Sequence, residues 1–284
     1  MDEPLLELDL APDEFEEFEF DVDAEGTIAS NDEWAFKKAD RLVNNLPRPV
    51  GRGDRRTEGE VFDKKTLMTL HKFLAGGVLR SLDFPVSTGK EANVFRGTTP
   101  AGHFVAVKIF RTNTATFKHV LKYIQGDDRF QGVAGDKRTL TYAWAQKEFR
   151  NLHRCREAGV SVPEPIKVLN NVLIMEYLGT AEGNWPKLKE LGRLEKPEQF
   201  YKSITQDFVD IANKAGLVHG DCSEYNILVE NSDGKEKKQV ARIIDVGQGV
   251  LRNHPMSVEF LRRDIKNITS YFRRQGLKVT EDEL

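Results

Sequence analysis

Apolar residues recur every three or four positions in four segments of the chain, and this spacing predicts a helix in each of them. The segments are 67–78, 142–157, 200–215 and 258–272. Between the first two, shorter apolar runs alternate with polar residues, which is typical of strands. They predict a three-stranded meander over 84–86, 93–96 and 104–110, with further strands at 163–168, 172–177, 227–229 and 241–244. The whole pattern predicts an α+β fold.

Two long segments fall outside this pattern. Residues 111–141 are polar and contain several Gly and Asp residues, and a stretch of that length is usually a mobile functional loop. Residues 1–34 contain 14 acidic and no basic side chains, and residues 44–60 combine Pro, Gly and charge. We therefore expect residues 1–60 to be an acidic, disordered tail followed by a linker.

Composition adds a charge asymmetry to this picture. The chain has 284 residues, of which 39% are hydrophobic, so it can bury a sizeable core. Residues 35–284 hold 31 acidic and 42 basic side chains, a net charge of +11. A basic body of this kind fits a polyanionic partner such as nucleic acid. A solvated, lysine-rich surface has the same composition, and no nucleic-acid-binding motif is visible.

No stretch approaches the roughly 18 to 20 apolar residues that a membrane helix needs, and the first residues do not resemble a signal peptide. We therefore expect a cytoplasmic protein with no membrane partner. Its two cysteines, Cys155 and Cys222, lack the number and spacing of a disulfide framework or a zinc site. We expect both thiols to be reduced and packed.

The motif His-Gly-Asp-Cys-Ser-Glu-Tyr-Asn over 219–226 places Asn226 five residues after Asp221, between a predicted helix and a predicted strand. In the catalytic loop of protein kinases, this spacing joins an Asp that orients the nucleophile to an Asn that binds Mg²⁺. An ordinary polar turn could carry the same residues. Asp245 strengthens the catalytic reading, because it follows an apolar strand and precedes Gly247 by two residues, as in the kinase Asp-Phe-Gly. A carboxylate at this position would bind Mg²⁺, because hard cations prefer oxygen ligands. The alternative is that Asp245 is a solvent-facing residue at the end of a strand.

Val-Ala-Val-Lys over 105–108 matches the kinase strand whose Lys neutralises the nucleotide phosphates. A lysine on a strand is often a solvated surface residue. A buried carboxylate partner would instead indicate the kinase role. Glu148 lies within the apolar face of the helix at 142–157, where an ionised carboxylate is costly without a cation. We therefore predict a salt bridge between Lys108 and Glu148.

Two further segments carry candidate ATP contacts. Ser87, Thr88, Gly89 and Lys90 occupy the turn between the first two strands, where their donors could reach phosphate oxygens. The apolar strand at 172–177 ends near a Gly, as a kinase hinge does. There, adenine would bond to the Glu176 carbonyl and the Leu178 N–H, with Met175 at the border of the pocket; a plain buried strand is the alternative, and both readings can hold.

Taken in order, these motifs resemble the RIO family of atypical protein kinases, and its type 1 branch in archaeal form, over about 62–275. The carriers are Ser-Thr-Gly-Lys-Glu-Ala-Asn-Val (87–94), the segment 217–228, Ile-Ile-Asp-Val-Gly-Gln (243–248) and the segment 254–268 with Phe-Leu-Arg-Arg-Asp-x-x-Asn-Ile. The resemblance implies a two-lobed protein-kinase-like fold with an extra N-terminal helix. Residues 61–178 would form that helix and the N-terminal lobe, and 179–284 a truncated C-terminal lobe.

The resemblance also implies ATP with Mg²⁺ or Mn²⁺ as cofactors, serine autophosphorylation and a role in maturing the small ribosomal subunit, with its rRNA as partner. Turnover would be largely ATP hydrolysis, with Asp245 as a phosphoryl acceptor. The chain departs from the type 1 pattern at Gly247, where Ser is usual, and at Gly220 and Cys222, where Ala and Leu are frequent. Neither departure removes a ligand.

Only 39 residues follow Asp245, and no Ala-Pro-Glu occurs among them. A broad peptide-binding surface is therefore not expected, which favours ATP hydrolysis or a substrate presented by a large assembly. A small-molecule phosphotransferase of the aminoglycoside-kinase type shares the His-Gly-Asp…Asn and Asp pattern and is the alternative. A nucleotide-gated assembly factor that binds RNA is a third reading, and it overlaps with the first.

Overall fold

The computed structural model describes residues 62–112, 117–130, 136–230 and 240–283, with the backbone alone at 117–120 and 283. The predicted tail and linker at 1–60 lie outside these ranges. The described chain begins with helix α3 (Lys64–Ala75), which precedes the first strand as predicted. Asp63 caps this helix by accepting a 2.8 Å hydrogen bond from the Thr66 N–H, and the chain turns at Gly76 and Gly77.

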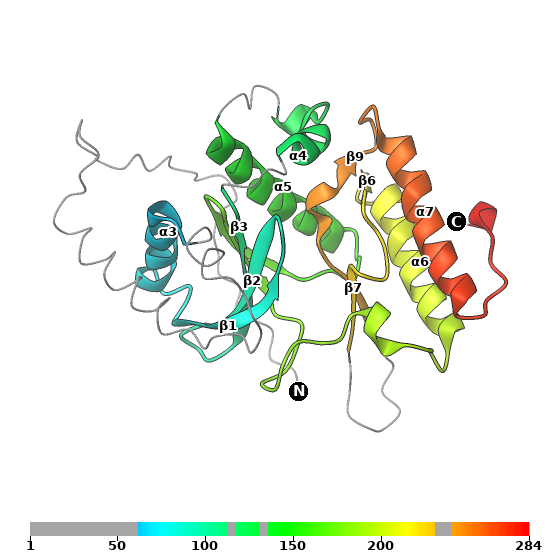
Figure 1. The fold of residues 1–284 in the computed structure, drawn as a ribbon, viewed down its shortest axis with the longest axis horizontal. Helices are drawn as coiled ribbons and strands as arrows, with labels where there is room; N and C mark the ends of the chain where they lie inside the picture. Colours follow the sequence, from blue (N-terminus) through cyan, green and yellow to red (C-terminus); the bar gives the residue numbers. More distant parts are fainter. Residues whose placement is uncertain (1–61, 113–116, 131–135, 231–239, 284) are drawn as a thin grey trace.

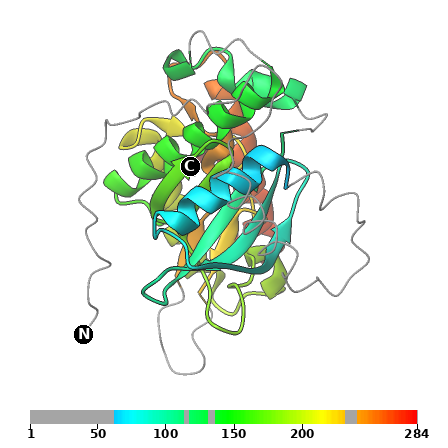
Figure 2. The same ribbon diagram turned by 90° about the vertical axis from the view of Figure 1, so that its left-hand side faces the viewer.

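A five-stranded antiparallel sheet follows, in the order β1-β2-β3-β5-β4. Its strands are β1 (Ser81–Thr88), β2 (Ala92–Thr98), β3 (Phe104–Phe110), β4 (Pro165–Leu169) and β5 (Val172–Glu176). The predicted meander and hairpin are therefore both present. Helix α3 lies across one face of this sheet (Figure 2), and Leu70 and Phe73 of α3 pack there against Val107 and Ile174. Strand β3 is central, so the residues it carries are held rigidly.

The prediction of a loop over 111–141 is wrong. This segment contains helix α4 (Phe117–Ile124), a short 3-10 turn (Asp128–Phe130) and the first residues of helix α5 (Lys137–Glu157). Helix α5 begins five residues before the predicted start. Its first turn is polar and is stabilised by Asp136, which accepts a 2.9 Å hydrogen bond from the Thr139 N–H, so apolar spacing could not reveal it.

The second half of the chain is built around helices α6 (Pro197–Asn213) and α7 (Ser257–Arg274), which lie at the opposite end of the molecule from α3 (Figure 1). Two short two-stranded sheets lie between these helices along the chain. They pair β6 (Leu217–Val218) with β9 (Val250–Leu251) and β7 (Ile227–Val229) with β8 (Ala241–Ile243), all antiparallel. The 3-10 turn Leu188–Leu191 precedes α6, Val246–Gln248 lies between β8 and β9, and Glu281–Glu283 lies near the C-terminus.

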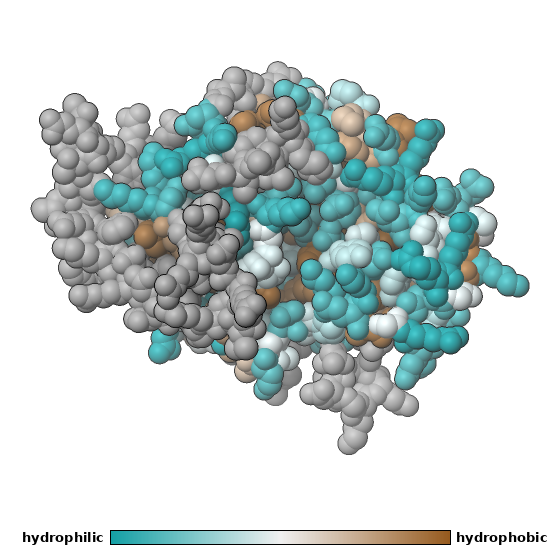
Figure 3. Space-filling view, viewed as in Figure 1, coloured by the Kyte–Doolittle hydropathy of each residue, from teal (hydrophilic) through white to brown (hydrophobic). Residues whose placement is uncertain are grey.

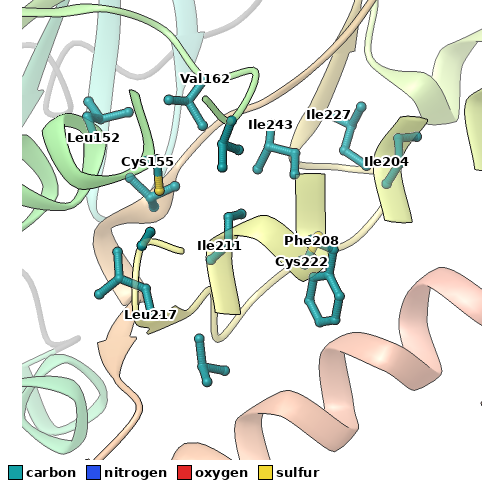
Figure 4. Close-up of a cluster of buried hydrophobic side chains, with 14 of the residues drawn as sticks. Leu152, Cys155, Val162, Ile204, Phe208, Ile211, Leu217, Cys222, Ile227 and Ile243 are labelled. Atoms are coloured by element: carbon teal, nitrogen blue, oxygen red, sulfur yellow. The ribbon is translucent and has the colours of Figure 1, made fainter. Parts of the chain in front are cut away.

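A buried apolar cluster joins α5 to this helical half (Figure 4). It combines Leu152 of α5 with Ile204 and Phe208 of α6 and with residues of the short strands. Cys155 and Cys222 both lie in it as free, buried thiols, as predicted. The described part of the face in Figure 3 is mainly hydrophilic, with small apolar patches.

The predicted apolar face of the last helix is partly wrong. Val258 is 59% exposed, whereas Phe260 and Asp264 are buried. The predicted Ile268 and Phe272 are buried, and Leu261 and Ile265 pack against the core, so the error is confined to the first turn, where the buried face also includes the carboxylate of Asp264 one turn later. No described helix has the length and apolarity to cross a membrane.

Candidate active site

Three charged residues that are far apart in the sequence meet beside the central strand. Lys108 of β3 lies with its Nζ 2.7 Å from both carboxylate oxygens of Glu148, which α5 contributes. The same Nζ lies 3.0 Å from Oδ1 of Asp245, just after β8. The predicted Lys108–Glu148 ion pair is therefore present, and Asp245 is an additional partner of Lys108 that the sequence patterns did not predict.

The electrostatics of this group favour a charged lysine. Burial opposes the ammonium form, but the nearby Asp245 and Glu148 carboxylates raise the pKa of Lys108 above its usual value. Burial raises the pKa of Glu148, and the Lys108 charge works against that rise. Desolvation by burial would also raise the pKa of Asp245, yet Lys108 holds that pKa below its ordinary value. Of the two carboxylates that contact Lys108, Asp245 is therefore the one that ionises more readily.

The backbone at Asp245 is unusual. Its φ is +61°, one of two positive values among the described non-glycine residues. A side chain in this left-handed region costs about 1–3 kcal/mol, and the surroundings must supply that energy. The side chain is 47% exposed, unlike the nearly buried Glu148 carboxylate. In this conformation the Oδ1 atom of Asp245 contacts Lys108, while about half of the side chain is accessible to solvent.

Asp221 and Asn226 face each other across the turn between β6 and β7. The Asn226 Nδ2 group donates to the Asp221 carbonyl at 2.9 Å and to its Oδ2 at 3.1 Å. The amide oxygen of Asn226 is thereby turned away from Asp221. Asn226 also accepts the Ile244 N–H at 2.9 Å through its backbone carbonyl, which ties this turn to the residue before Asp245. Burial and the nearby Asp245 raise the pKa of Asp221, opposed by His219.

The donor set fits a hard divalent cation. The Asn226 amide oxygen and the Asp245 carboxylate are oxygen ligands on two chain segments joined by a backbone hydrogen bond. Within the described ranges, no group of three or more His, Cys, Asp or Glu residues could hold a metal by itself. Mg²⁺ is usually held by one or two protein groups together with nucleotide phosphates, so two ligands suffice.

Asp264 of α7 binds the backbone on both sides of Asp221, a contact that the sequence patterns did not reveal. It is fully buried and accepts hydrogen bonds from the N–H groups of Gly220 at 2.7 Å and Cys222 at 2.9 Å, on either side of Asp221. Arg263 donates to the Gly220 carbonyl. The segment 254–268 carries a family motif, but nothing in its spacing says that its Asp reaches the turn at 219–226.

Gly220 is required by this arrangement. Its φ is +78°, and a Cβ there would lie 2.9 Å from the Gln248 carbonyl oxygen. An alanine at this position would therefore require the turn to shift. The glycine therefore permits the close approach of this turn to Gln248, on the segment that follows Asp245.

We expect Asp264→Ala to destabilise the fold by about 2–3 kcal/mol, because it leaves two buried N–H groups without acceptors. Burial raises the pKa of Asp264 to about 6, against the pull of His219 and the two N–H donors. Since this pKa lies above the unfolded value, the ionised carboxylate costs stability as the pH rises from about 4 to 6. Asp264→Asn should therefore be milder than the alanine variant, as measured by urea unfolding at pH 7. Equal losses in the two variants would contradict this role.

The predicted ATP contacts lie on two other segments. Ser87 and Thr88 end strand β1, and Gly89 and Lys90 lie in the turn to β2; all four are exposed, and the Gly89 N–H donates to the Ala92 carbonyl at 2.9 Å. At the predicted hinge, Met175 and Leu178 are buried. The Glu176 carboxylate accepts from the Glu164 N–H at 3.1 Å and from Arg242 at 3.4 Å, so it braces the hinge. The nucleotide contacts of these residues remain predictions.

Comparison with known proteins agrees with this geometry. The RIO domain family matches residues 93–284. The RIO-type serine/threonine-protein kinase Rio1 of Haloferax volcanii is 38% identical over 96% of this chain and 89% of its own length. The Rio1 kinase of Methanocaldococcus jannaschii is 37% identical over 100% of this chain and 89% of its own. The human serine/threonine-protein kinase RIO1 is 36% identical over 86% of this chain and 42% of its own.

The fold agrees as well. A crystal structure of the Rio2 kinase from Chaetomium thermophilum, in an ADP/Mg²⁺-phosphoaspartate complex, superposes with a TM-score of 0.61 at 20% identity. The match covers 92% of this chain and 85% of that chain. The predicted kinase-like fold is therefore confirmed, and the aminoglycoside-kinase alternative is not favoured, because the relatives are protein kinases. The chain belongs to the RIO family of ATP-dependent serine/threonine protein kinases, within its Rio1 type.

Proposed function

We propose that this enzyme binds ATP with Mg²⁺ or Mn²⁺ between Lys108 and the pair formed by Asn226 and Asp245. The observation that carries the proposal is the meeting of Lys108, Glu148 and Asp245 beside the Asp221–Asn226 turn. The metal, when bound, would neutralise charge on the phosphates. Lys108 would bind the α- and β-phosphates, and Glu148 would keep its ammonium group in place.

The remaining candidate residues complete the proposed nucleotide site. Ser87, Thr88, Gly89 and Lys90 would cover the phosphates from the exposed β1–β2 turn. The backbone of Glu176 and Leu178 would bind adenine, and Met175 would border its pocket. Asp221 would take the proton of the attacking hydroxyl group, because its raised pKa suits a general base.

Asp245 is also proposed as a phosphoryl acceptor. In that step, a carboxylate oxygen of Asp245 bonds to the γ-phosphorus as the bond to ADP breaks, and ADP leaves. Water then displaces the phosphoryl group and restores the carboxylate, with its proton passing to Asp221. The low pKa and exposure of Asp245 support this role, and the Rio2 kinase of Chaetomium thermophilum forms a phosphoaspartate complex with ADP and Mg²⁺. Serine autophosphorylation would be a second outcome of the same site.

The cellular role that we propose is maturation of the small ribosomal subunit in the cytoplasm, with the pre-ribosomal particle and its rRNA as partners. Two features support it: the Rio1-type relatives and the net charge of +11 on residues 35–284. A basic surface would bind the phosphate backbone of RNA largely without sequence specificity. The enzyme would then act as an ATP-driven switch on a large assembly.

The test is incubation with ATP labelled at the γ-phosphate, with and without purified small-subunit precursor. We expect label as free phosphate and as a transient, hydroxylamine-sensitive adduct on the protein, because hydroxylamine cleaves acyl phosphates and leaves phosphoserine intact. Label that resists hydroxylamine and never appears as phosphate would exclude the acceptor role of Asp245. ATP use that rises only when aminoglycosides or sugars are added would revive the small-molecule alternative.

A further inference from the structure

A buried polar cluster lies beside the turn that follows Asp245 and next to Glu148 on α5. We define it as Asp127, Arg129, Lys147 and Asn151. Lys147 and Asn151 belong to α5 and are fully buried, and Lys147 directly precedes Glu148. Asp127 is 2% exposed and comes from the segment between β3 and α5. Buried charges of this kind are costly, so their contacts need a reason.

The α5 members of the cluster bind the turn that follows Asp245. The Asn151 Nδ2 group donates to the carbonyls of Val246 and Gly249, each at 2.8 Å. Lys147 donates to the Gly247 carbonyl at 3.2 Å and also to that of Gly249. Two side chains thus hold three backbone carbonyls within the four residues after Asp245. This supports the left-handed conformation of Asp245, which would otherwise be strained.

The other two members hold the α5 residues in turn. Arg129 donates to the Asn151 amide oxygen at 2.9 Å, which fixes the amide with its donors toward the turn. Arg129 also binds both carboxylate oxygens of Asp127, at 2.9 and 2.7 Å. The Asp127 carboxylate lies 4.0 Å from the Lys147 ammonium group, so it partly balances two cations.

The segment that carries Asp127 and Arg129 is itself attached to the helical half of the chain. His254 pairs with the Gln125 carbonyl at 2.8 Å. Gly126 has a φ of +92°, and a Cβ there would lie 2.9 Å from Pro255. The segment 125–130 is therefore seated between α5 and the chain after β9, within the region predicted from the sequence to be a mobile loop.

We propose that Lys147 and Asn151 are positioning residues for Asp245, and that Asp127 and Arg129 complete this support from the segment 125–130. The proposal rests on the proposed metal-binding role of Asp245. Its consequence is that ATP turnover depends on a segment outside the nucleotide site. A partner that draws 125–130 away from α5 would loosen the turn at 246–249 and release the metal, while Lys108 and Glu148 stay paired.

The test compares Arg129→Met with Arg150→Met in the full chain. Arg129→Met removes the link to Asn151 and Asp127 without touching Asp245. Arg150 is an exposed residue of α5 next to Asn151, with its guanidinium carbon 5.7 Å from the centre of the Phe130 ring, and it serves as the matched control. We expect Arg129→Met to weaken Mn²⁺ binding in the presence of ADP, read by electron paramagnetic resonance, by about 3- to 30-fold. The kcat for ATP should fall by a similar factor with little change in KM, and Arg150→Met should change neither.

Hydrogen exchange of the amides at 246–250 gives a readout that needs no nucleotide. It should accelerate in Arg129→Met while the helices keep their protection. A second variant, Asn151→Asp, keeps an acceptor for Arg129 but removes the two donors to the turn, and it should show the same changes. Unaltered Mn²⁺ affinity and exchange in either folded variant would overturn the proposal. Failure of the wild type to bind Mn²⁺ with ADP would instead reject the metal site, and the exchange comparison would still decide the positioning role.

Discussion

Asp245→Asn is expected to lower ATP turnover by about 100-fold or more while leaving the protein folded. The change removes the negative charge that would bind the metal and the nucleophilic oxygen that would accept the phosphoryl group. The fold should tolerate it, because the side chain is 47% exposed and an amide oxygen can still accept from Lys108. Asparagine also adopts positive φ values more readily than most residues, so the backbone at +61° gains no strain.

The measurement is steady-state phosphate release at saturating ATP, together with thermal unfolding of the same preparations. The exposed Asp282 offers a matched control, since Asp282→Asn makes the same chemical change far along the chain from the site. We expect the control to retain wild-type turnover and wild-type unfolding temperature, and Asp245→Asn to lose turnover while still unfolding in one cooperative transition, somewhat below the wild-type temperature because it loses the ion pair with Lys108. Undiminished turnover in Asp245→Asn would mean that this carboxylate is neither ligand nor acceptor.

Local motifs predicted those parts of the site whose residues lie close together in the sequence or whose burial requires a particular partner. Asp221 and Asn226 are five residues apart, and one turn brings them together. Glu148 could be paired with Lys108 because a carboxylate on an apolar helix face requires a cation, and the Lys108 strand was the candidate. The five-residue spacing identified the Asp221–Asn226 pair, and the cost of a buried carboxylate identified Lys108 as the partner of Glu148.

The supporting residues could not be predicted in this way. Lys147 and Asn151 bind carbonyls about 100 positions along the chain, and polar residues on a helix normally indicate a solvated face. Asp264 bonds to backbone N–H groups, which no side-chain pattern identifies. The error over 111–141 has two causes. The 3-10 turn at 128–130 is held by the Asp127–Arg129 pair and by Asn151, which no apolar spacing reveals. Helix α4 does carry apolar residues at helical spacing, at Phe117, Val120, Leu121 and Ile124, and the prediction of a loop overlooked them.

Lys108→Met is expected to destabilise the fold by about 3 kcal/mol and to abolish nucleotide-dependent turnover. The Glu148 carboxylate is nearly inaccessible to solvent and has Lys108 on both of its oxygens. Without the ammonium group, burial and the repulsion from Asp245 act unopposed, so the pKa of Glu148 rises further above its unfolded value.

The sign of the pH dependence follows from that shift. A carboxyl group whose folded pKa is raised holds its proton longer in the folded state, so the free energy of unfolding falls as the pH rises above the unfolded pKa, until the folded pKa is passed. The stability deficit of Lys108→Met relative to the wild type should therefore be larger at pH 8 than at pH 5, as measured by urea unfolding. Adding Glu148→Gln to Lys108→Met should remove most of this pH-dependent deficit, because an amide requires no counter-ion, yet it should not restore turnover. An equal deficit at both pH values would show that Glu148 is not the uncompensated charge and that Lys108 supports the fold through its packing on β3.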